Sequence, residues 1–570
     1  MRTRVPSRLP EGLLYAVAFF GPFAFGAVEP WSRAALELLA FALALACFLR
    51  GRAGGPTETD GFWIFPAGVA AFGAWQLLTP VAPDGPRPSL PFTAAPHETE
   101  SAVLLWAAYA CVAWSVPRVL SGHEAARRFA RALFGLGLVT AALGLAQAAT
   151  GASGPYWLRP ALGAAPFAAY YNRDHAANLM MMALAMGAGV WWSRRKPAGA
   201  DGLPRGNPAA RALVIAGGAL LFAGLCVCGS RGAFLAMPLA GAATALAGAG
   251  FAKRARRRRL VAGAAVAVAA LVVFAAFRHV GAAADAGGKV EASIAARFFI
   301  YGDARRWLAE APLFGTGLGS FSAVYPAYQD ADLRGVVEHA HSDWLELALE
   351  TGAAGLLAAL LAAGFAAASA VRTWRAARSS EMRALIGGAV GAAAAFLAHS
   401  LFEFSFQIPA NAVVFFAIAG FLVSAPAWAD KVVRAGRPEP PSPLAALAGV
   451  AVFLVLSGAT AAHAAGRTGR PDARELTRAA AGLYAAAGEG DAADPETLRA
   501  ALPYALAAVE LRPHDAPALT FAGGCLRKLG RGADAAGMFA RARAVRFLAP
   551  APLEAAEAPR RLEKVRELVR

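Results

Sequence analysis

The stretch DWLELALETGAAGLLAALLAAGFAAASAV, residues 343–371, decides the fold class. It contains no charged residue from Thr351 to Val371, and as an α-helix that part alone can cross a hydrocarbon core of about 30 Å. Comparable apolar runs recur along the chain, in which 57% of the residues are hydrophobic and 16% are charged. Soluble globular proteins average about 25% charged residues. The sequence therefore predicts an all-α fold, namely a polytopic bundle of membrane helices.

The apolar runs predict about 12–13 spans. We place them at residues 12–28, 34–49, 62–79, 102–117, 132–150, 175–193, 212–228, 232–250, 260–278, 343–371, 384–401, 411–428 and 443–463. No cleavable signal peptide is expected, because Leu13–Val28 lacks a small-residue cleavage site. The five cysteines suggest no disulfide framework.

The formal net charge is +17, but its placement argues against nucleic-acid binding. With the N-terminus inside, lysine and arginine gather in the segments predicted to be cytoplasmic, as the positive-inside rule requires. The run KRARRRR, residues 253–259, is then a topological anchor beside a span. An odd number of spans places the C-terminal tail outside the cytoplasm.

Four parts are predicted along the chain. They are N-terminal transmembrane helices (1–130), a membrane core (131–428) with a large extracytoplasmic loop (279–341), a final transmembrane helix (443–463) and an extracytoplasmic tail (467–570). The tail regains charge, and six of its residues follow tetratricopeptide spacing: Gly523, Leu526, Gly530, Ala535, Phe539 and Ala542. We expect a helical-repeat domain, with a generic helical hairpin as the alternative, and either form suits a protein partner.

The large loop combines an amphipathic helix, expected over about residues 293–310, with the glycine-rich segment PLFGTGLGSF (312–321). This segment superficially resembles a dinucleotide-binding loop, but no βαβ pattern surrounds it. We expect its glycines to let the backbone approach a ligand or a helix closely.

Two histidines, His339 and His341, end the loop in the stretch EHAHSDWLELALETG (338–352). Two imidazoles alone do not complete a zinc site, which takes three or four ligands, so we expect no metal and no cofactor. An imidazole can accept a hydroxyl proton near neutral pH, although a pH-sensitive hinge stays an alternative. Leu345 and Leu349 follow His341 at helical steps, which predicts that His341 lies on the first turn of the helix.

Several arginines are predicted outside, where positive charge is depleted. They are Arg173, Arg231, Arg297, Arg305 and Arg306. Guanidinium groups bind phosphate in a bidentate manner and stay charged, so such residues at the membrane boundary suit a diphosphate headgroup. Snorkelling or a helix-end contact is the alternative for each of them.

Other polar residues are candidates for support at the same face. Asn172 and Asp174 can cap the helix that His175 begins. His399 and Glu403 are four residues apart, which predicts one side of a helix and a pairing of the two.

Five segments together resemble the O-antigen ligase and polymerase superfamily. They are YNRDHAANL (171–179), SRGAFLA (230–236), APLFGTGLGSFSAVYP (311–326), EHAHSDWLELALETGAAGL (338–356) and HSLFEFSFQIPA (399–410). The resemblance covers roughly residues 130–425, and its most specific part runs from Pro312 to Gly355. Many large members also carry extracytoplasmic tetratricopeptide tails.

The resemblance implies a metal-independent, inverting glycosyltransferase in the bacterial inner membrane, with its active face and tail in the periplasm. Its donor would be a glycan on undecaprenyl diphosphate, and its acceptor a lipid A-core sugar or a growing glycan. Arg231 and Arg173 would hold the diphosphate, assisted by Arg297 or Arg305. His341 would activate the acceptor hydroxyl, although Asp343 and the additional His339 depart from the family's pattern.

Three kinds of alternative remain beside the ligase reaction, namely two other transfer reactions, a transporter and a scaffold. A polysaccharide polymerase and a protein O-oligosaccharyltransferase need the same donor site and are not separated by the sequence. A polysaccharide-lipid transporter fits less well, because the predicted spans are nearly free of charge whereas transporters bind at the membrane midplane. A non-catalytic scaffold that recruits a partner through its tail is the third alternative.

Overall fold

The chain folds as helices wherever the structure describes regular elements, apart from one isolated bridge between Phe167 and Tyr170. The computed structural model describes residues 8–51, 60–79, 89–120, 122–158, 165–194, 208–249, 289–325, 328–329, 337–377, 379–424, 441–468, 480, 483–484, 486–487, 494–511 and 516–544. The predicted all-α class is confirmed.

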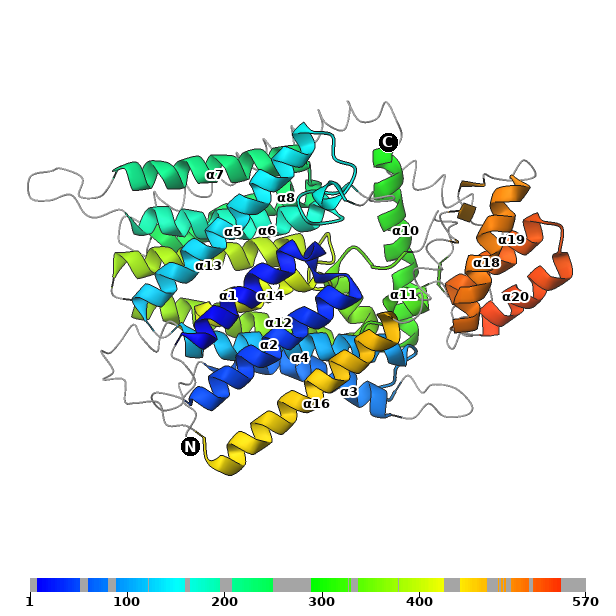
Figure 1. Ribbon diagram of the computed structural model, residues 1–570, viewed down its shortest axis with the longest axis horizontal. Helices are drawn as coiled ribbons and strands as arrows, with labels where there is room; N and C mark the ends of the chain where they lie inside the picture. The colour runs from blue at the N-terminus through cyan, green and yellow to red at the C-terminus, as the bar shows by residue number, and fades with distance from the viewer. Residues whose placement is uncertain are drawn as a thin grey trace, which may run out of the picture. The chain divides into compact units, whose positions relative to one another are not determined.

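Every predicted span within the described residues coincides with a helix (Figure 1). These helices are α1 (Leu9–Phe23), α2 (Pro30–Arg50), α3 (Ile64–Leu78), α4 (Pro96–Val119), α5 (His123–Ala149), α6 (Arg173–Ser193), α7 (Pro208–Cys228), α8 (Arg231–Ala249), α12 (Asp343–Ala376), α13 (Ser380–His399), α14 (Pro409–Ser424) and α16 (Pro443–Thr468). Among the described helices, α2, α3, α4, α5, α7, α12, α13 and α16 are long and apolar enough to cross a membrane, and α1 and α14 are shorter apolar helices. The polytopic membrane architecture is therefore confirmed, while the run 253–259 and the predicted span 260–278 lie outside the described residues.

Two compact units make up the chain. The first contains residues 1–68, 104–280 and 358–462, and the second contains residues 69–103, 281–357 and 463–570.

The core of the first unit contains α14, a helix that is buried on all sides. Every residue of α14 is buried, as expected for a helix that is apolar all round. Helices α6 and α13 cross where Gly189 meets Gly388, because a Cβ atom at either glycine would lie 3.0 Å from the Cα atom of the other. Small residues let membrane helices approach this closely.

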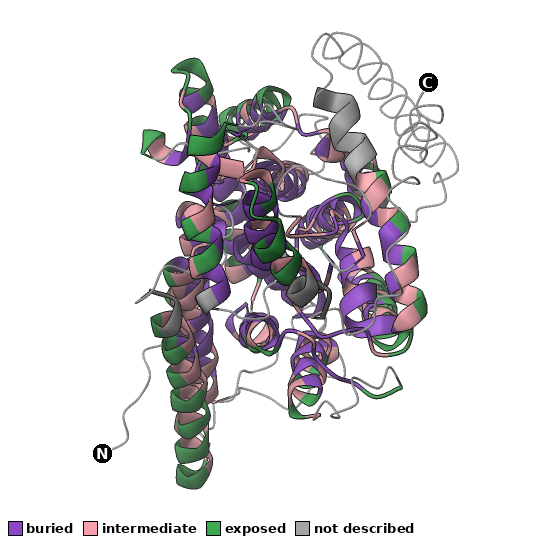
Figure 2. Ribbon diagram, turned by 90° about the vertical axis from the view of Figure 1, so that its right-hand side faces the viewer, coloured by how far each residue is buried: buried purple, intermediate pink, exposed green. Residues whose placement is uncertain are grey.

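Apolar side chains also cover outward faces of the first unit, as a lipid-facing surface requires. Leu213 of α7 is 73% exposed, Leu361 of α12 is 66% exposed and Leu444 of α16 is 78% exposed. The ribbon coloured by burial shows exposed helix faces beside buried ones (Figure 2). The solvent for these faces is hydrocarbon, so their exposure does not oppose folding.

The second unit holds α10 (Lys289–Glu310), the helix predicted over residues 293–310, and the short α11 (Phe321–Val324). Its core stacks the ring of Trp307 against those of Phe321 and Tyr328, with centroids 5.6 and 5.4 Å away. Ala340 and Leu349 belong to the same cluster. The described part of the loop is therefore a packed structure with its own core.

Within the described residues of the tail lie the helices α18 (Pro495–Leu511), α19 (Ala516–Lys528) and α20 (Gly532–Ala544). Gly530 lies in the middle of the α19–α20 connection with φ +77°. Gly523 of α19 faces the ring of Phe539 in α20, since a Cβ atom there would lie 2.9 Å from it. The tail is helical in this range, and its assignment as a tetratricopeptide repeat stays a prediction.

Candidate functional site

Arg173 and Arg231 begin two helices of the first unit, α6 and α8. The Cys228 thiol donates a hydrogen bond of 3.1 Å to the carbonyl oxygen of Arg173. A Cβ atom at Gly229, whose φ is +65°, would lie 3.7 Å from Arg173 Nη1. The guanidinium of Arg173 therefore lies beside the turn that leads into Arg231. A cation beside the N-terminus of a second helix, which itself begins with an arginine, favours an anionic ligand.

Asn172 caps helix α6 as predicted. Its Oδ1 atom accepts a hydrogen bond of 2.9 Å from the backbone N–H of Asp174. His175 follows inside the bundle, where its ring packs edge-on against Phe404 with centroids 4.8 Å apart. Asn411 Nδ2 donates to the His175 carbonyl oxygen over 2.8 Å. These contacts fix the start of α6 and thereby the position of Arg173.

His399 lies in a buried polar network that the sequence did not predict. Asn178 Nδ2 lies 3.0 Å from His399 Nδ1 and 3.0 Å from Ser405 Oγ, and all three side chains are fully buried. A Cβ atom at Gly232 would lie 3.2 Å from His399 Nε2. The imidazole therefore packs against Gly232, the residue that follows Arg231. Any larger residue at this position would bring its Cβ atom closer to the ring than ordinary contact distance.

His399 and Glu403 do not lie on one side of a helix as predicted, and the pairing of their side chains stays a prediction. Helix α13 ends at His399, so Glu403 lies in the turn that follows, where its backbone N–H donates to the His399 carbonyl oxygen over 3.0 Å. The Glu403 side chain is buried. Nδ1 of His399 lies 3.2 Å from Ser405 Oγ and 3.0 Å from Asn178 Nδ2.

In the second unit, the glycine-rich segment 312–321 docks on the first half of α12. The N–H groups of Thr316 and Gly317 donate to the carbonyl oxygens of Leu349 and Glu350 over 3.2 and 3.0 Å. In return, the N–H of Ala353 donates to the Pro312 carbonyl oxygen over 2.8 Å. The segment therefore approaches a helix closely, which is one of the two roles predicted for its glycines.

This docking requires glycine on both partners. Gly315 has φ +66°, and a Cβ atom there would lie 2.3 Å from the carbonyl carbon of Glu350. Gly352 has φ +64° and ψ −163°, so α12 is interrupted at this residue, and a Cβ atom there would lie 2.3 Å from the carbonyl carbon of Leu313. The prediction of a regular helix through residues 350–352 is wrong at Gly352. The hydrogen bonds exchanged with the glycine-rich segment require the non-helical backbone conformation of this residue.

Gln76 of α3 joins the two docked segments. Its Nε2 atom donates to the carbonyl oxygens of Phe314 and Glu350 over 2.9 and 3.1 Å, and its Oε1 atom accepts from the N–H of Leu318 over 3.0 Å. A buried amide with three such contacts uses most of its capacity for hydrogen bonding. Gln76 was not predicted as a functional residue from the sequence, because it lies in an otherwise apolar predicted span.

His339 is held by Glu346. The His339 Nδ1 atom lies 2.9 Å from Glu346 Oε1, and the backbone N–H of Ala340 donates to Glu346 Oε2 over 2.8 Å. The Glu346 side chain is buried. One carboxylate therefore binds both the ring of residue 339 and the backbone of residue 340, which gives His339 a structural partner.

His341 lies before the helix and not on its first turn, in contrast to the prediction. Helix α12 begins at Asp343, and His341 has φ +52°, in the left-handed region that costs a non-glycine residue about 1 kcal/mol. Its carbonyl oxygen accepts a hydrogen bond of 3.2 Å from the Tyr301 hydroxyl. The side chain is half-buried, so a strained turn presents this imidazole at the edge of the unit.

Arg297 and Arg305 flank Tyr301 on α10, one turn before it and one turn after it. Arg297 is half-buried, whereas Arg305 is exposed. Arg306 differs from both, because it donates to the Tyr328 carbonyl oxygen and lies 3.3 Å from Asp303 Oδ1. Asp303, which the sequence reasoning also missed, accepts from the Tyr325 hydroxyl over 3.0 Å. Arg306 and Asp303 therefore hold the loop core together.

The family comparison covers the centre of the chain. Residues 216–360 match the family model described as O-antigen ligase. The matched range contains Arg231, Arg297, Arg305, His339 and His341, whereas Arg173, His399 and Glu403 lie outside it. No protein of curated function matches the chain. The match supports an O-antigen ligase-type membrane glycosyltransferase activity.

Proposed function

We propose that this chain is an inverting glycosyltransferase that moves a glycan from an undecaprenyl-diphosphate carrier to an acceptor hydroxyl in surface polysaccharide assembly. The observation that carries the proposal is the placement of Arg173 beside the Gly229–Arg231 turn. Guanidinium groups at two helix N-termini suit a diphosphate, and they would also stabilise the charge that develops as it leaves.

An apolar cavity along the same helices supports a lipid-linked donor. It has a volume of about 420 Å³ and is lined by Met181 and Trp191 of α6, Met237 of α8, and residues of α5 and α7. Arg173 and Arg231 lie at the first residues of α6 and α8. A carrier with a charged headgroup and a long apolar chain needs this combination, namely cations at the helix starts and an apolar cavity further along.

His341 would act as the general base. Its imidazole would accept the proton of the acceptor hydroxyl while the hydroxyl oxygen attacks the anomeric carbon. The bond between that carbon and the diphosphate oxygen would break, and the diphosphate would leave with the electron pair, which inverts the anomeric configuration. No metal and no cofactor enters these steps. The strained backbone of His341 supports this role, because such conformations cluster at functional sites.

Arg297, Arg305 and His339 would support the reaction. Arg297 lies one helical turn before Tyr301, whose hydroxyl contacts the His341 carbonyl oxygen. Arg305 lies one turn after Tyr301 on the same helix. His339, fixed by Glu346, would hold the turn. The same proposal includes an inner-membrane location and a periplasmic tail that binds a protein partner. It also includes the domain limits 1–130, 131–428, 443–463 and 467–570.

The test is a transfer reaction with purified full-length protein in detergent, undecaprenyl-diphosphate-linked glycan as donor and lipid A-core as acceptor. His341→Ala should lower the rate about 100-fold or more, and Arg231→Ala by about 100-fold. Arg499→Ala, on the exposed face of α18, is the matched control and should transfer normally. Equal rates for all three variants would refute the assignment, and donor that moves between leaflets without being consumed would indicate a transporter.

The acceptor is identified in a deletion strain. Full-length glycan stranded on the carrier indicates the ligase reaction, which we favour. A single repeat on the acceptor indicates a polymerase. Normal surface glycans with under-modified proteins indicate a protein O-oligosaccharyltransferase.

A further inference from the structure

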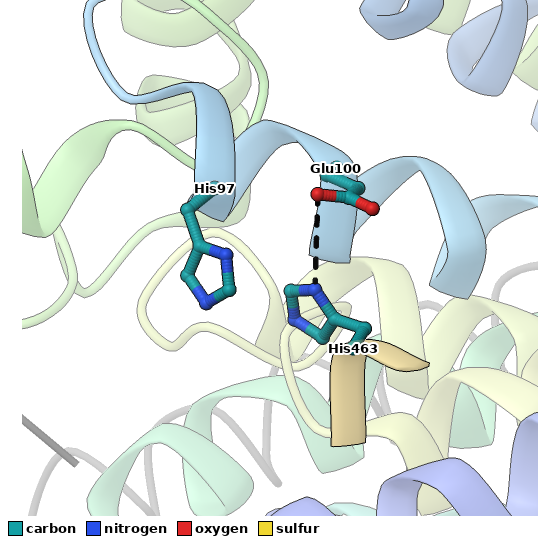
Figure 3. Close-up of side chains that lie close together, drawn as sticks. All are labelled: His97, Glu100 and His463. Carbon is teal, nitrogen blue, oxygen red and sulfur yellow. Dashed lines mark ion pairs between the residues drawn. The ribbon is translucent and has the colours of Figure 1, made fainter. Parts of the chain in front are cut away.

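Two histidines that are far apart in the sequence meet in the second unit. His97 lies in the first turn of α4, and His463 lies near the end of α16. Their rings stack with centroids 4.4 Å apart at an angle of 25°. Glu100 lies one turn after His97, and its Oε2 atom is 4.0 Å from His463 Nδ1. Figure 3 shows the two imidazoles and the carboxylate side by side, on two different helices.

These three side chains have the donor set of a metal site. One ligand atom from each, two imidazole nitrogens and a carboxylate oxygen, lies within 4.8 Å of the others. Two histidines and one carboxylate bind zinc in three-ligand sites, which keep a fourth position for water. Ligand atoms at a tetrahedral zinc ion are about 3.3 Å apart, so the three groups must move closer by rotating their side chains. The Glu100 side chain is 53% exposed and has room to do so.

We propose that His97, Glu100 and His463 bind a divalent transition-metal ion of the zinc class. The ion would join the end of α16 to the start of α4. Its ligands include none of the residues proposed for glycan transfer. The proposal therefore does not depend on the proposed function, and it leaves the transfer steps free of metal.

The location of the ligands gives the ion a structural task. The segment just before His97 supports the glycine-rich segment 312–321, since the N–H of Ala94 donates to the Thr316 carbonyl oxygen over 2.8 Å. Thr93 Oγ1 accepts from the N–H of Ala95 over 3.0 Å and lies 2.7 Å from Thr99 Oγ1. An ion on His97 and Glu100 would fix this first turn of α4, and through it the segment that docks on α12.

Binding is measured on full-length protein in detergent, purified with a tag that contains no histidine. Zinc is titrated against a chromophoric chelator. His97→Asn, His463→Asn and Glu100→Gln should each weaken zinc binding at least about tenfold, since even the partners of metal ligands contribute that much. His123→Asn is the matched control, because His123 is exposed and lies outside the cluster. Glu100→Gln changes an exposed side chain, so a loss of folding does not explain its effect.

Two further measurements make the result decisive. Cobalt bound to the wild-type protein should show the intense visible bands of a four-coordinate site, and Glu100→Gln should lose them. Zinc should slow amide hydrogen exchange at residues 94–100 in the wild type but not in Glu100→Gln. The proposal is wrong if the wild type binds no stoichiometric zinc, or if the three variants bind it as tightly as His123→Asn. In that case the stacked imidazoles only pack the two helix ends together.

Discussion

The hydroxyl oxygen of Tyr301 lies 3.2 Å from the backbone carbonyl oxygen of His341. This contact joins α10 to the turn in which His341 has φ +52°. A carbonyl that accepts a hydrogen bond from a residue on a packed helix has little freedom to rotate. The relationship indicates that α10 positions the imidazole by holding its backbone.

Tyr301→Phe tests this positioning. It removes the hydroxyl but keeps the ring, so we expect the protein to fold and the transfer rate to fall about tenfold or less, as the loss of one hydrogen bond allows. The fall should appear in kcat more than in KM, because the turn carries the proposed base. Tyr504→Phe, on a tyrosine that is 42% exposed in α18, should have no effect. Full activity in Tyr301→Phe would mean that the turn keeps its geometry without α10.

The two histidines of the loop should respond differently to substitution. His339→Ala removes the ring that contacts Glu346 and should lower the melting temperature, since a buried carboxylate loses a partner at a cost of about 1–3 kcal/mol. Once the protein is folded, its transfer rate should stay well above that of His341→Ala. The reverse order of rates would assign the base to His339, and both rates are measured below the melting temperature of each variant.

The docking of the glycine-rich segment should not tolerate side chains. Gly315→Ala and Gly352→Ala each place a Cβ atom 2.3 Å from a backbone carbonyl carbon at positive φ, so we expect a loss of several kcal/mol and little folded protein. Gly302→Ala is the control, because nothing lies within 4 Å of its Cβ position in α10. It should stabilise the helix by up to about 1 kcal/mol. Thermal unfolding in detergent distinguishes the three variants.

The sequence was sufficient to predict the fold class and the eight described helices that are long and apolar enough to cross a membrane, because an apolar run of sufficient length has one low-energy structure in a bilayer. It also predicted the Asn172 cap, since that interaction joins residues two positions apart. Structure that depends on residues close together in the chain could therefore be predicted from the sequence.

The contacts that position the candidate site could not be predicted from the sequence, because they join residues far apart in the chain. Gln76 binds Phe314 across 238 positions, and Asn178 binds His399 across 221 positions. The interruption of α12 at Gly352 has the same origin, as the docked segment takes over the hydrogen bonds of that turn. The regular spacing of Leu345 and Leu349 suggested a longer helix because spacing carries no information about such a partner.

The side chains of the buried network at His399 should contribute to stability by unequal amounts. Asn178→Ala removes the donor to both His399 Nδ1 and Ser405 Oγ, whereas Ser405→Ala leaves the Asn178–His399 contact intact. Hydrogen bonds between membrane helices contribute about 0.6 kcal/mol on average and up to about 1.7. We expect Asn178→Ala to lower the melting temperature more than Ser405→Ala does. Equal melting temperatures would show that the three groups do not act as a network.

The tail offers a test of whether its role is interaction or catalysis. A Cβ atom at Gly523 would lie 2.9 Å from the Phe539 ring, so Gly523→Leu should separate α19 from α20 at a cost of about 1–3 kcal/mol. We expect faster proteolysis of the tail and unchanged glycan transfer by the purified protein, since all proposed site residues lie outside it. Gly537→Ala is the control, because its Cβ position meets nothing within 4 Å. If Gly523→Leu slows transfer by purified protein while Gly537→Ala does not, the tail takes part in the reaction itself and the interaction role is wrong.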